Sequence, residues 1–209
     1  MRAGLSCYLV LDAALCGDRL VETARAAARG GAGIVQLRMK QATTAERIAT
    51  GRAVQAAVRG RARFVVNDDI EAALALSAGG VHVGQGDMPA AEVRRAIGPD
   101  ALLGLSVETE AQARAIPDCV DYVGAGPVRA TATKPGHAPP TGWDGLARIV
   151  AACPVPAVAI GGVGAADAAA AVRAGAAGLA VVSAICAAAD PEQAAREIAD
   201  AVARAKEAA

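Results

Sequence analysis

The chain has 209 residues, of which 54% are hydrophobic and only 2% aromatic, so its core must be built mainly from Ala, Val, Leu and Ile. Lysine plus arginine and aspartate plus glutamate both total 21, and this balance disfavours a general nucleic-acid-binding surface. No apolar run is long enough to predict a membrane span, and the N-terminal apolar stretch is too short for a signal peptide. We therefore expect a soluble, cytoplasmic protein.

Eight short apolar segments along the chain predict strands. They begin at Cys7, Gly33, Arg63, Gly80, Leu102, Asp121, Ala157 and Gly178. Alanine-rich segments with charges at helical spacing lie between them, for example residues 19–32, 43–59 and 165–178. Glycines in "RGGAG", "SAGG" and "RAGAAG" are expected to close helices of this kind. The alternation predicts a parallel sheet that is covered by helices on both faces.

Eight such β-then-α units predict a single-domain (β/α)8 TIM barrel over residues 1–209, with its active site at the C-terminal ends of the strands. The competing architecture is an open doubly wound sheet that binds a dinucleotide. That fold should carry G-x-G-x-x-G after its first strand, and "LVLDAALCGD" lacks this motif. The long irregular stretch at residues 126–142 is expected to be functional.

Five cysteines are widely spaced and include no C-x-x-C pair, which disfavours a disulfide framework or a zinc cluster. They are Cys7, Cys16, Cys119, Cys153 and Cys186. Most have apolar neighbours in the sequence, so we expect them to act as small core residues.

Polar residues follow the predicted strands at the end where a barrel places its chemistry. They are Gln36, Arg38 and Lys40 at the second strand, Asn67, Asp68 and Asp69 at the third, Asp87 after the fourth, Ser106 at the fifth, Thr131, Thr133 and Lys134 in the long loop, and Ser183 at the eighth. Gly161 and Gly162 after the seventh strand and Val182 at the eighth add backbone N–H groups at the same end. The alternative for the second strand is a frayed end with solvated charges. The glycine turn either binds a phosphate through backbone N–H groups or only forms a tight turn.

The acidic residues in this set predict a cation site. One of Asp68 and Asp69 is expected to cap the next helix, while the other shares a pocket with Asp87. Two carboxylates at such range repel each other unless a cation joins them or they share a proton. Oxygen ligands with only His82 nearby favour Mg²⁺ over zinc.

We expect neither histidine to take part directly in catalysis. We interpret His82, in mid-strand, as a core residue or as support for a ligand-binding neighbour, and His137 is uninformative. No Ser-His-Asp or Cys-His arrangement is present, so no catalytic nucleophile is expected.

Seven motifs spread over most of the chain resemble one known family. They are "YLVLD", "QLRMK", "VNDDIEAALALSAGGVHVGQGD", "GLSVET", "DYVGAGPVRATATKPGHAPP", "AIGGV" and "VVSAI", in this order between Tyr8 and Ile185. Together they resemble the thiamine-phosphate synthase family. The resemblance implies a transferase of thiamine biosynthesis that joins 4-amino-2-methyl-5-hydroxymethylpyrimidine diphosphate to thiazole ethyl phosphate. The products are thiamine phosphate and pyrophosphate, formed by Mg²⁺-assisted dissociative displacement.

The resemblance also implies a role for each matching residue. Asp68 and Asp87 would bind Mg²⁺, which leaves Asp69 as the helix cap. The pyrimidine diphosphate would be bound by Gln36, Arg38, Lys40, Asn67, Ser106 and Lys134. The thiazole phosphate would be bound by Thr131, Thr133, Gly162, Val182 and Ser183. Met39 and Arg129-Ala130 stand where the family pattern has other residues.

Three other functions remain open at this point. The thiazole tautomerase branch of the same fold uses a histidine where this chain has Ser106, and it needs neither a diphosphate nor a metal. A sugar-phosphate aldolase or epimerase is the second, although a Schiff-base aldolase would need a lysine deep on a strand. The third is an inert barrel that only binds phosphorylated ligands. Under each of these hypotheses we expect small phosphorylated molecules as ligands and no nucleic-acid or membrane partner. The sequence does not predict the oligomeric state.

Overall fold

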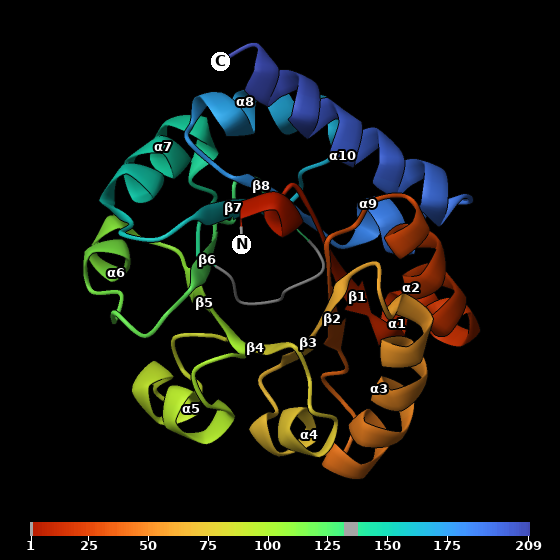
Figure 1. The fold of residues 1–209 in the computed structure, drawn as a ribbon. Coiled ribbons are helices and arrows are strands. Elements are labelled where there is room, and N and C mark those ends of the chain that lie inside the picture. Colours follow the sequence, from red (N-terminus) through yellow and green to blue (C-terminus); the bar gives the residue numbers. More distant parts are fainter. Residues whose placement is uncertain (1, 132–137) are drawn as a thin grey trace.

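The computed structural model describes residues 2–131 and 138–209, and eight parallel strands in it close into a barrel (Figure 1). The strands are β1 (Cys7–Asp12), β2 (Ile34–Arg38), β3 (Arg63–Asn67), β4 (Gly80–Val83), β5 (Leu102–Val107), β6 (Tyr122–Ala125), β7 (Ala157–Ile160) and β8 (Gly178–Val181). Each strand pairs with the next in chain order, and β8 pairs with β1 to close the ring. The predicted (β/α)8 barrel is confirmed, and the open doubly wound sheet is excluded.

Helices surround the barrel in the order of the strands (Figure 1). The longer ones are α2 (Leu20–Arg29), α3 (Thr44–Val58), α4 (Ile70–Ala75), α5 (Ala90–Ile97), α6 (Glu110–Arg114), α7 (Gly142–Ala152), α8 (Ala168–Arg173) and α10 (Pro191–Glu207). Short turns of helix occur at η1 (Arg2–Leu5), α1 (Ala13–Cys16), η2 (Gly17–Arg19), η3 (Ala165–Asp167) and α9 (Ser183–Cys186). In the described part of the chain, no helix has both the length and the apolar character needed to cross a membrane.

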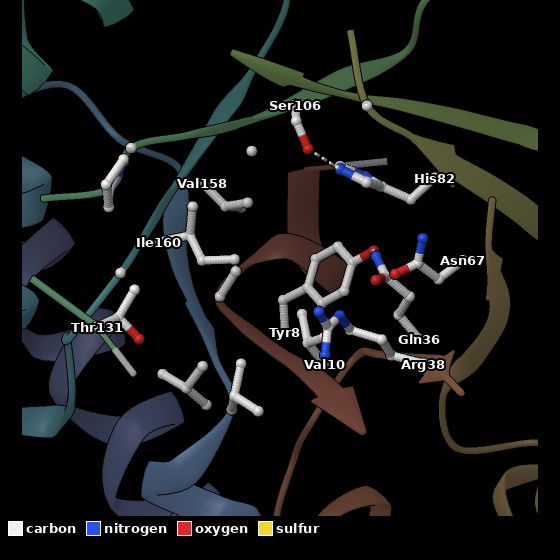
Figure 2. Close-up of a pocket in the computed structure, with 18 of the residues that line it drawn as sticks. Tyr8, Val10, Gln36, Arg38, Asn67, His82, Ser106, Thr131, Val158 and Ile160 are labelled. Carbon is white, nitrogen blue, oxygen red and sulfur yellow. Dashed lines mark hydrogen bonds between the residues drawn. The ribbon is translucent and has the colours of Figure 1, made fainter. Parts of the chain in front are cut away.

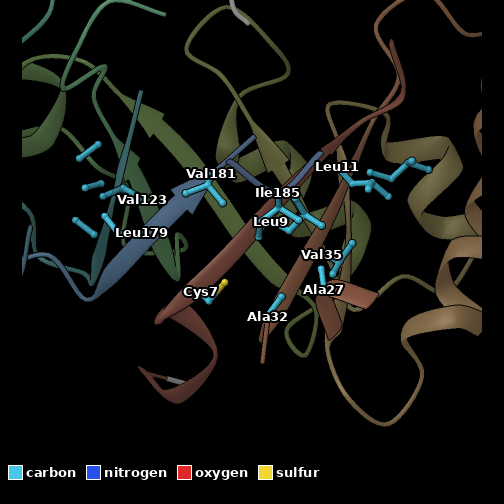
Figure 3. Close-up of a cluster of buried hydrophobic side chains, with 14 of the residues drawn as sticks. Cys7, Leu9, Leu11, Ala27, Ala32, Val35, Val123, Leu179, Val181 and Ile185 are labelled. Atoms are coloured by element: carbon cyan, nitrogen blue, oxygen red, sulfur yellow. The ribbon is translucent and has the colours of Figure 1, made fainter. Parts of the chain in front are cut away.

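Two hydrophobic layers follow from the alternation of side chains along the strands. Leu9 and Leu11 of β1 point outward and pack under the helices, together with residues such as Val35 (Figure 3). Tyr8 and Val10 point into the barrel and belong to a separate interior cluster. That interior cluster also contains Leu5 of η1, which is 1% exposed. Side chains therefore fill this part of the barrel interior.

The cysteines are free thiols that belong to the outer layer, as expected. Cys7, Cys16 and Cys186 are buried within it, and Cys119 and Cys153 are partly buried and pack against it. The prediction of small core residues is confirmed.

The glycines expected to end helices do so in two of the three places. Gly30 caps α2, and Gly175 takes φ +87° after α8. After α4 the expectation was wrong, because Leu76 is the C-cap and Ser77 takes the left-handed conformation with φ +46°. Gly80 is required there for a different reason, since a Cβ atom on it would lie 2.5 Å from the Leu102 carbonyl oxygen.

Candidate active site

A cavity of about 190 Å³ lies at the C-terminal ends of the strands (Figure 2). Its lining includes every predicted site residue that the structure describes: Gln36, Arg38, Lys40, Asn67, Asp68, Asp87, Ser106, Thr131, Gly162, Val182 and Ser183. Thr133 and Lys134, like His137, lie outside the described residues. The structure thus brings these residues together from the strands β2 to β8 and the turns that follow them.

Strand β2 carries two of the predicted ligands on its inner face. Gln36 and Arg38 both belong to the strand, and Gln36 is only 4% exposed. Lys40 lies in the turn two residues beyond the strand. The alternative of a frayed end with solvated charges is therefore wrong for Gln36 and Arg38.

The two adjacent acids after β3 diverge because of one backbone conformation. Asp68 takes φ +63°, a left-handed conformation that is uncommon for a residue with a side chain. Asp69 follows as the N-cap of α4, and its carboxylate accepts a 2.9 Å hydrogen bond from the Ala72 amide. The cap that the resemblance implied is confirmed, and Asp68 is left to line the pocket.

Asp68 and Asp87 interact with each other across the pocket wall. Burial raises the pKa of Asp68, the Lys40 ammonium group lowers it in part, and the charge of Asp87 raises it again. The Lys40 Nζ atom donates to Asp68 Oδ2 at 2.5 Å. Asp87 Oδ2 accepts from the Gly84 amide at 2.7 Å, which fixes the carboxylate over its own turn. Two carboxylates thus converge beside the Lys40 ammonium group, which contacts one of them.

This pair of carboxylates fits a hard divalent cation. No group of three or more His, Cys, Asp or Glu side chains suited to a metal occurs among residues 2–131 and 138–209. A cation at this place would therefore be held by the two aspartates and by oxygen atoms of a bound ligand, which is the arrangement in which proteins commonly hold Mg²⁺.

Two largely buried ion pairs hold arginine residues of this side, and the sequence did not indicate them. Arg38 donates to Asp12, which also caps α1 by accepting from the Ala14 amide at 3.0 Å. Arg47 of α3 donates to Asp69 at 2.8 Å and to the Met39 carbonyl at 3.0 and 3.1 Å. The guanidinium of Arg47 therefore ties the turn that carries Lys40 to the turn that carries Asp68.

The floor of the pocket is a buried network of polar side chains (Figure 2). The Gln36 Nε2 atom donates to the Tyr8 hydroxyl at 2.7 Å, and the Tyr8 and Tyr122 hydroxyls are 2.7 Å apart. His82 Nδ1 lies 3.2 Å from the Tyr122 hydroxyl, and His82 Nε2 lies 3.1 Å from Ser106 Oγ. Burial raises the pKa of both tyrosines, so both hydroxyls keep their protons at neutral pH.

The opposite wall is built from the glycine turn after β7. Gly161 and Gly162 take φ +100° and +63°, and a Cβ atom on Gly161 would lie 2.5 Å from Pro127 Cβ. Arg129 binds Asp167 through two hydrogen bonds of 2.8 and 2.6 Å and also donates to the Gly162 carbonyl at 3.1 Å. The Arg129 guanidinium lies over the Trp143 ring, 5.4 Å from its centroid. The sequence did not indicate this clamp, which joins the β6 loop to the glycine turn.

The two walls suit two anionic ligands side by side. One wall offers Arg38, Lys40 and a carboxylate pair for a cation, and the other offers a glycine turn and the start of α9. Apolar residues Val158 and Ile160 also line the pocket. A (β/α)8 barrel with such a pocket at the C-terminal ends of its strands is typical of barrel enzymes that act on small phosphorylated molecules.

Comparison with known proteins identifies the family within this class. The family model described as thiamine monophosphate synthase matches residues 7–185. The thiamine-phosphate synthase of Laribacter hongkongensis is 50% identical over 196 residues, covering 92% of this chain and 93% of that protein. The thiamine-phosphate synthase of Solidesulfovibrio magneticus is 56% identical over 194 residues, covering 91% and 92%. The solved thiamine phosphate pyrophosphorylase from Pyrococcus furiosus superposes with a TM-score of 0.88 at 34% identity, covering 98% of each chain. The chain belongs to the thiamine monophosphate synthase family.

Proposed function

We propose that this protein joins 4-amino-2-methyl-5-hydroxymethylpyrimidine diphosphate to thiazole ethyl phosphate and releases thiamine phosphate and pyrophosphate. Membership of the family supports this activity. The observation that carries the assignment of residues is that the predicted ligands of both substrates, where the structure describes them, line one pocket.

We assign the pyrimidine diphosphate to the wall that carries the charges. Arg38 and Lys40 would bind the diphosphate, with Lys134 contributed by the long loop. Gln36, Asn67 and Ser106 would bind the pyrimidine ring. Arg38 keeps a fixed position because Asp12 binds it, so the positive charge does not have to be ordered when the substrate arrives.

The thiazole phosphate is assigned to the opposite wall. Its phosphate oxygens would accept hydrogen bonds from Thr131, Thr133 and Ser183 and from backbone N–H groups near Gly162 and Val182. Gly162 takes φ +63°, and a Cβ atom on it would lie 3.0 Å from Arg129 Cβ and 3.1 Å from the Ala130 carbonyl oxygen, so a side chain there would disturb the turn that presents these N–H groups.

The reaction requires charge stabilisation and positioning rather than a protein nucleophile. The bond between the methylene carbon and the diphosphate oxygen breaks, and its electron pair leaves with pyrophosphate. The amino group of the ring stabilises the resulting cation. The thiazole nitrogen then forms the new C–N bond with its own lone pair, so no proton needs to be removed. Cationic residues around the leaving group and a fixed partner nitrogen supply what this step needs.

We assign Mg²⁺ to Asp68 and Asp87 as the cofactor. When bound there together with the diphosphate, the ion would neutralise the charge that develops on the leaving group. The mutual repulsion of the two carboxylates supports a bound cation, and their oxygen atoms are the ligands that a hard cation such as Mg²⁺ prefers.

The test is a pyrophosphate-release assay on the purified protein with both substrates, with and without Mg²⁺. We expect one pyrophosphate for each thiamine phosphate, dependent on Mg²⁺. Binding of both substrates without release of pyrophosphate would instead support the hypothesis that the barrel is catalytically inert and only binds phosphorylated ligands. Isomerisation of a thiazole phosphate tautomer without pyrophosphate release would support the hypothesis that the protein is a thiazole tautomerase.

A further inference from the structure

A hydrogen-bonded network spans the barrel interior from Gln36 to Ser106. The donors and acceptors that its members can supply fix the direction in which each hydroxyl and ring proton is donated. Its members are Gln36, Tyr8, Tyr122, His82 and Ser106, which come from β2, β1, β6, β4 and β5. We call these five residues the floor network. Both tyrosines are only 1% exposed, so their hydroxyl protons need acceptors within the protein.

The first donor in the network is the side-chain amide of Gln36. Because Gln36 Nε2 donates to Tyr8, the Tyr8 hydroxyl must pass its own proton on, and its other neighbour is Tyr122. Tyr122 in turn donates to His82 Nδ1, which must therefore carry no proton. The proton of the neutral ring then lies on Nε2, from which it is donated to Ser106 Oγ.

The direction of the floor network decides what the pocket offers to a ligand. Gln36 donates one N–H to the Tyr8 hydroxyl, so the Oε1 atom of Gln36 is the group that can accept a hydrogen bond from a ligand. Ser106 accepts from His82, which leaves its hydroxyl proton free to be donated. In the opposite direction, Ser106 would donate to His82 and the Gln36 amide would be reversed, so the pocket would offer a donor at Gln36 and an acceptor at Ser106.

We propose that Tyr8, Tyr122 and His82 are positioning residues that make the pocket selective for an aminopyrimidine over an oxopyrimidine. This inference rests on the proposed function. An aminopyrimidine presents an amino donor next to a ring nitrogen that accepts, which matches the acceptor on Gln36 and the donor on Ser106. The corresponding oxopyrimidine presents the reverse pattern, and a site whose buried polar groups are left unpaired rejects such an analogue strongly.

The first test is the tautomer of His82, measured by ¹⁵N NMR on the ligand-free protein at neutral pH. The chain has two histidines, so a His137→Gln variant assigns the signals of His82 without ambiguity. We expect a protonated Nε2 and an unprotonated Nδ1. A proton on Nδ1 would overturn the inference. This result does not depend on turnover, so it separates a failure of this inference from a failure of the proposed function.

The second test is Tyr122→Phe, which interrupts the floor network by removing one hydroxyl. We expect KM for the pyrimidine diphosphate to rise about tenfold, equivalent to about 1.4 kcal/mol. KM for the thiazole phosphate should stay unchanged. In a Ser106→Ala background the same substitution should have little further effect, because the two residues act through one network.

A matched control removes a buried hydroxyl outside the pocket. Thr23 of α2 is 1% exposed, and Thr23→Val should leave both KM values unchanged. Equal rises of both KM values in Tyr122→Phe, or the same effect in Thr23→Val, would show a merely structural role and would overturn the inference.

Discussion

Gly104→Ala should destabilise the protein by forcing a methyl group between two side chains of the floor network. Gly104 of β5 pairs with His82 on one neighbouring strand and with Tyr122 on the other. A Cβ atom on Gly104 would lie 2.3 Å from Tyr122 Cζ, 2.4 Å from its hydroxyl oxygen and 2.4 Å from His82 Nδ1. Carbon atoms pack favourably at about 3.5–4.0 Å, so each ring would have to move by roughly 1 Å or more.

The magnitude follows from two costs that add. Overpacking of a well-packed interior costs about 1–3 kcal/mol, and loss of the Tyr122–His82 hydrogen bond leaves buried groups unpaired at about 1–3 kcal/mol. We expect the free energy of unfolding, measured by urea denaturation, to fall by about 3 kcal/mol. In a protein of this size the melting temperature should fall by about 6–12 °C.

Gly124→Ala is the matched control for this prediction. Gly124 lies on the neighbouring strand β6, and a Cβ atom there would lie 3.5 Å from His82 Cε1, an ordinary contact distance. The added methyl group should leave the free energy of unfolding within about 1 kcal/mol of the wild type, since it also restricts the unfolded chain. Equal stability of the two variants would refute the packing that we describe around Gly104.

Three further predictions concern the pocket walls. Asp87→Ala should abolish Mg²⁺-dependent pyrophosphate release while the protein keeps its fold, as measured by the release assay and circular dichroism. Arg129→Ala should raise KM for the thiazole phosphate several-fold and change the free energy of unfolding by less than about 1 kcal/mol, because the pair is partly exposed. Arg148→Ala, which breaks an exposed pair with Glu110, should leave that KM unchanged. Asp69→Ala should lower the free energy of unfolding, measured by urea denaturation, by more than the about 1 kcal/mol of a lost helix cap, because it also leaves the largely buried Arg47 guanidinium without its carboxylate partner.

The Asp69 variant should also change the response to acid. Burial alone would raise the pKa of Asp69, but the Ala72 amide, Thr44 and Arg47 together hold it below its usual range. A carboxyl group whose pKa is lower in the folded state stabilises the fold above its unfolded pKa, and this contribution is lost as the pH falls from about 4. Urea denaturation at several pH values should show a shallower loss in Asp69→Ala than in the wild type. An identical slope in both proteins would contradict the assigned hydrogen bonds.

The strands and their ends could be predicted because their signal is local. The predicted segments at residues 80–83 and 157–160 coincide with β4 and β7, since a parallel strand buried on both faces reads as a continuous apolar run. The position rule for barrels then indicated Gln36 and Asp87 as pocket residues. The choice between Asp68 and Asp69 as helix cap depended on the resemblance, because a backbone angle decides it.

The supporting residues could not be predicted because their signal is not local. Tyr8 and Tyr122 lie 114 positions apart in the sequence. Each lies in an apolar strand, so the sequence alone predicts an ordinary core residue at both positions. Arg47 lies in a helix with regularly spaced charges and reads as solvent-facing, yet it binds Asp69 and the Met39 carbonyl. Such partners become visible only when the barrel closes and brings distant strands and turns together.

The central claim is that Asp68 and Asp87 hold one divalent cation together with the diphosphate. Titration of Mn²⁺, in place of Mg²⁺, into the protein with the pyrimidine diphosphate present, followed by electron paramagnetic resonance, tests this claim most directly. We predict one bound ion per chain in the wild type, with binding much weaker when the diphosphate is omitted and lost in Asp87→Ala. Equal Mn²⁺ binding by the wild type and Asp87→Ala would contradict the claim.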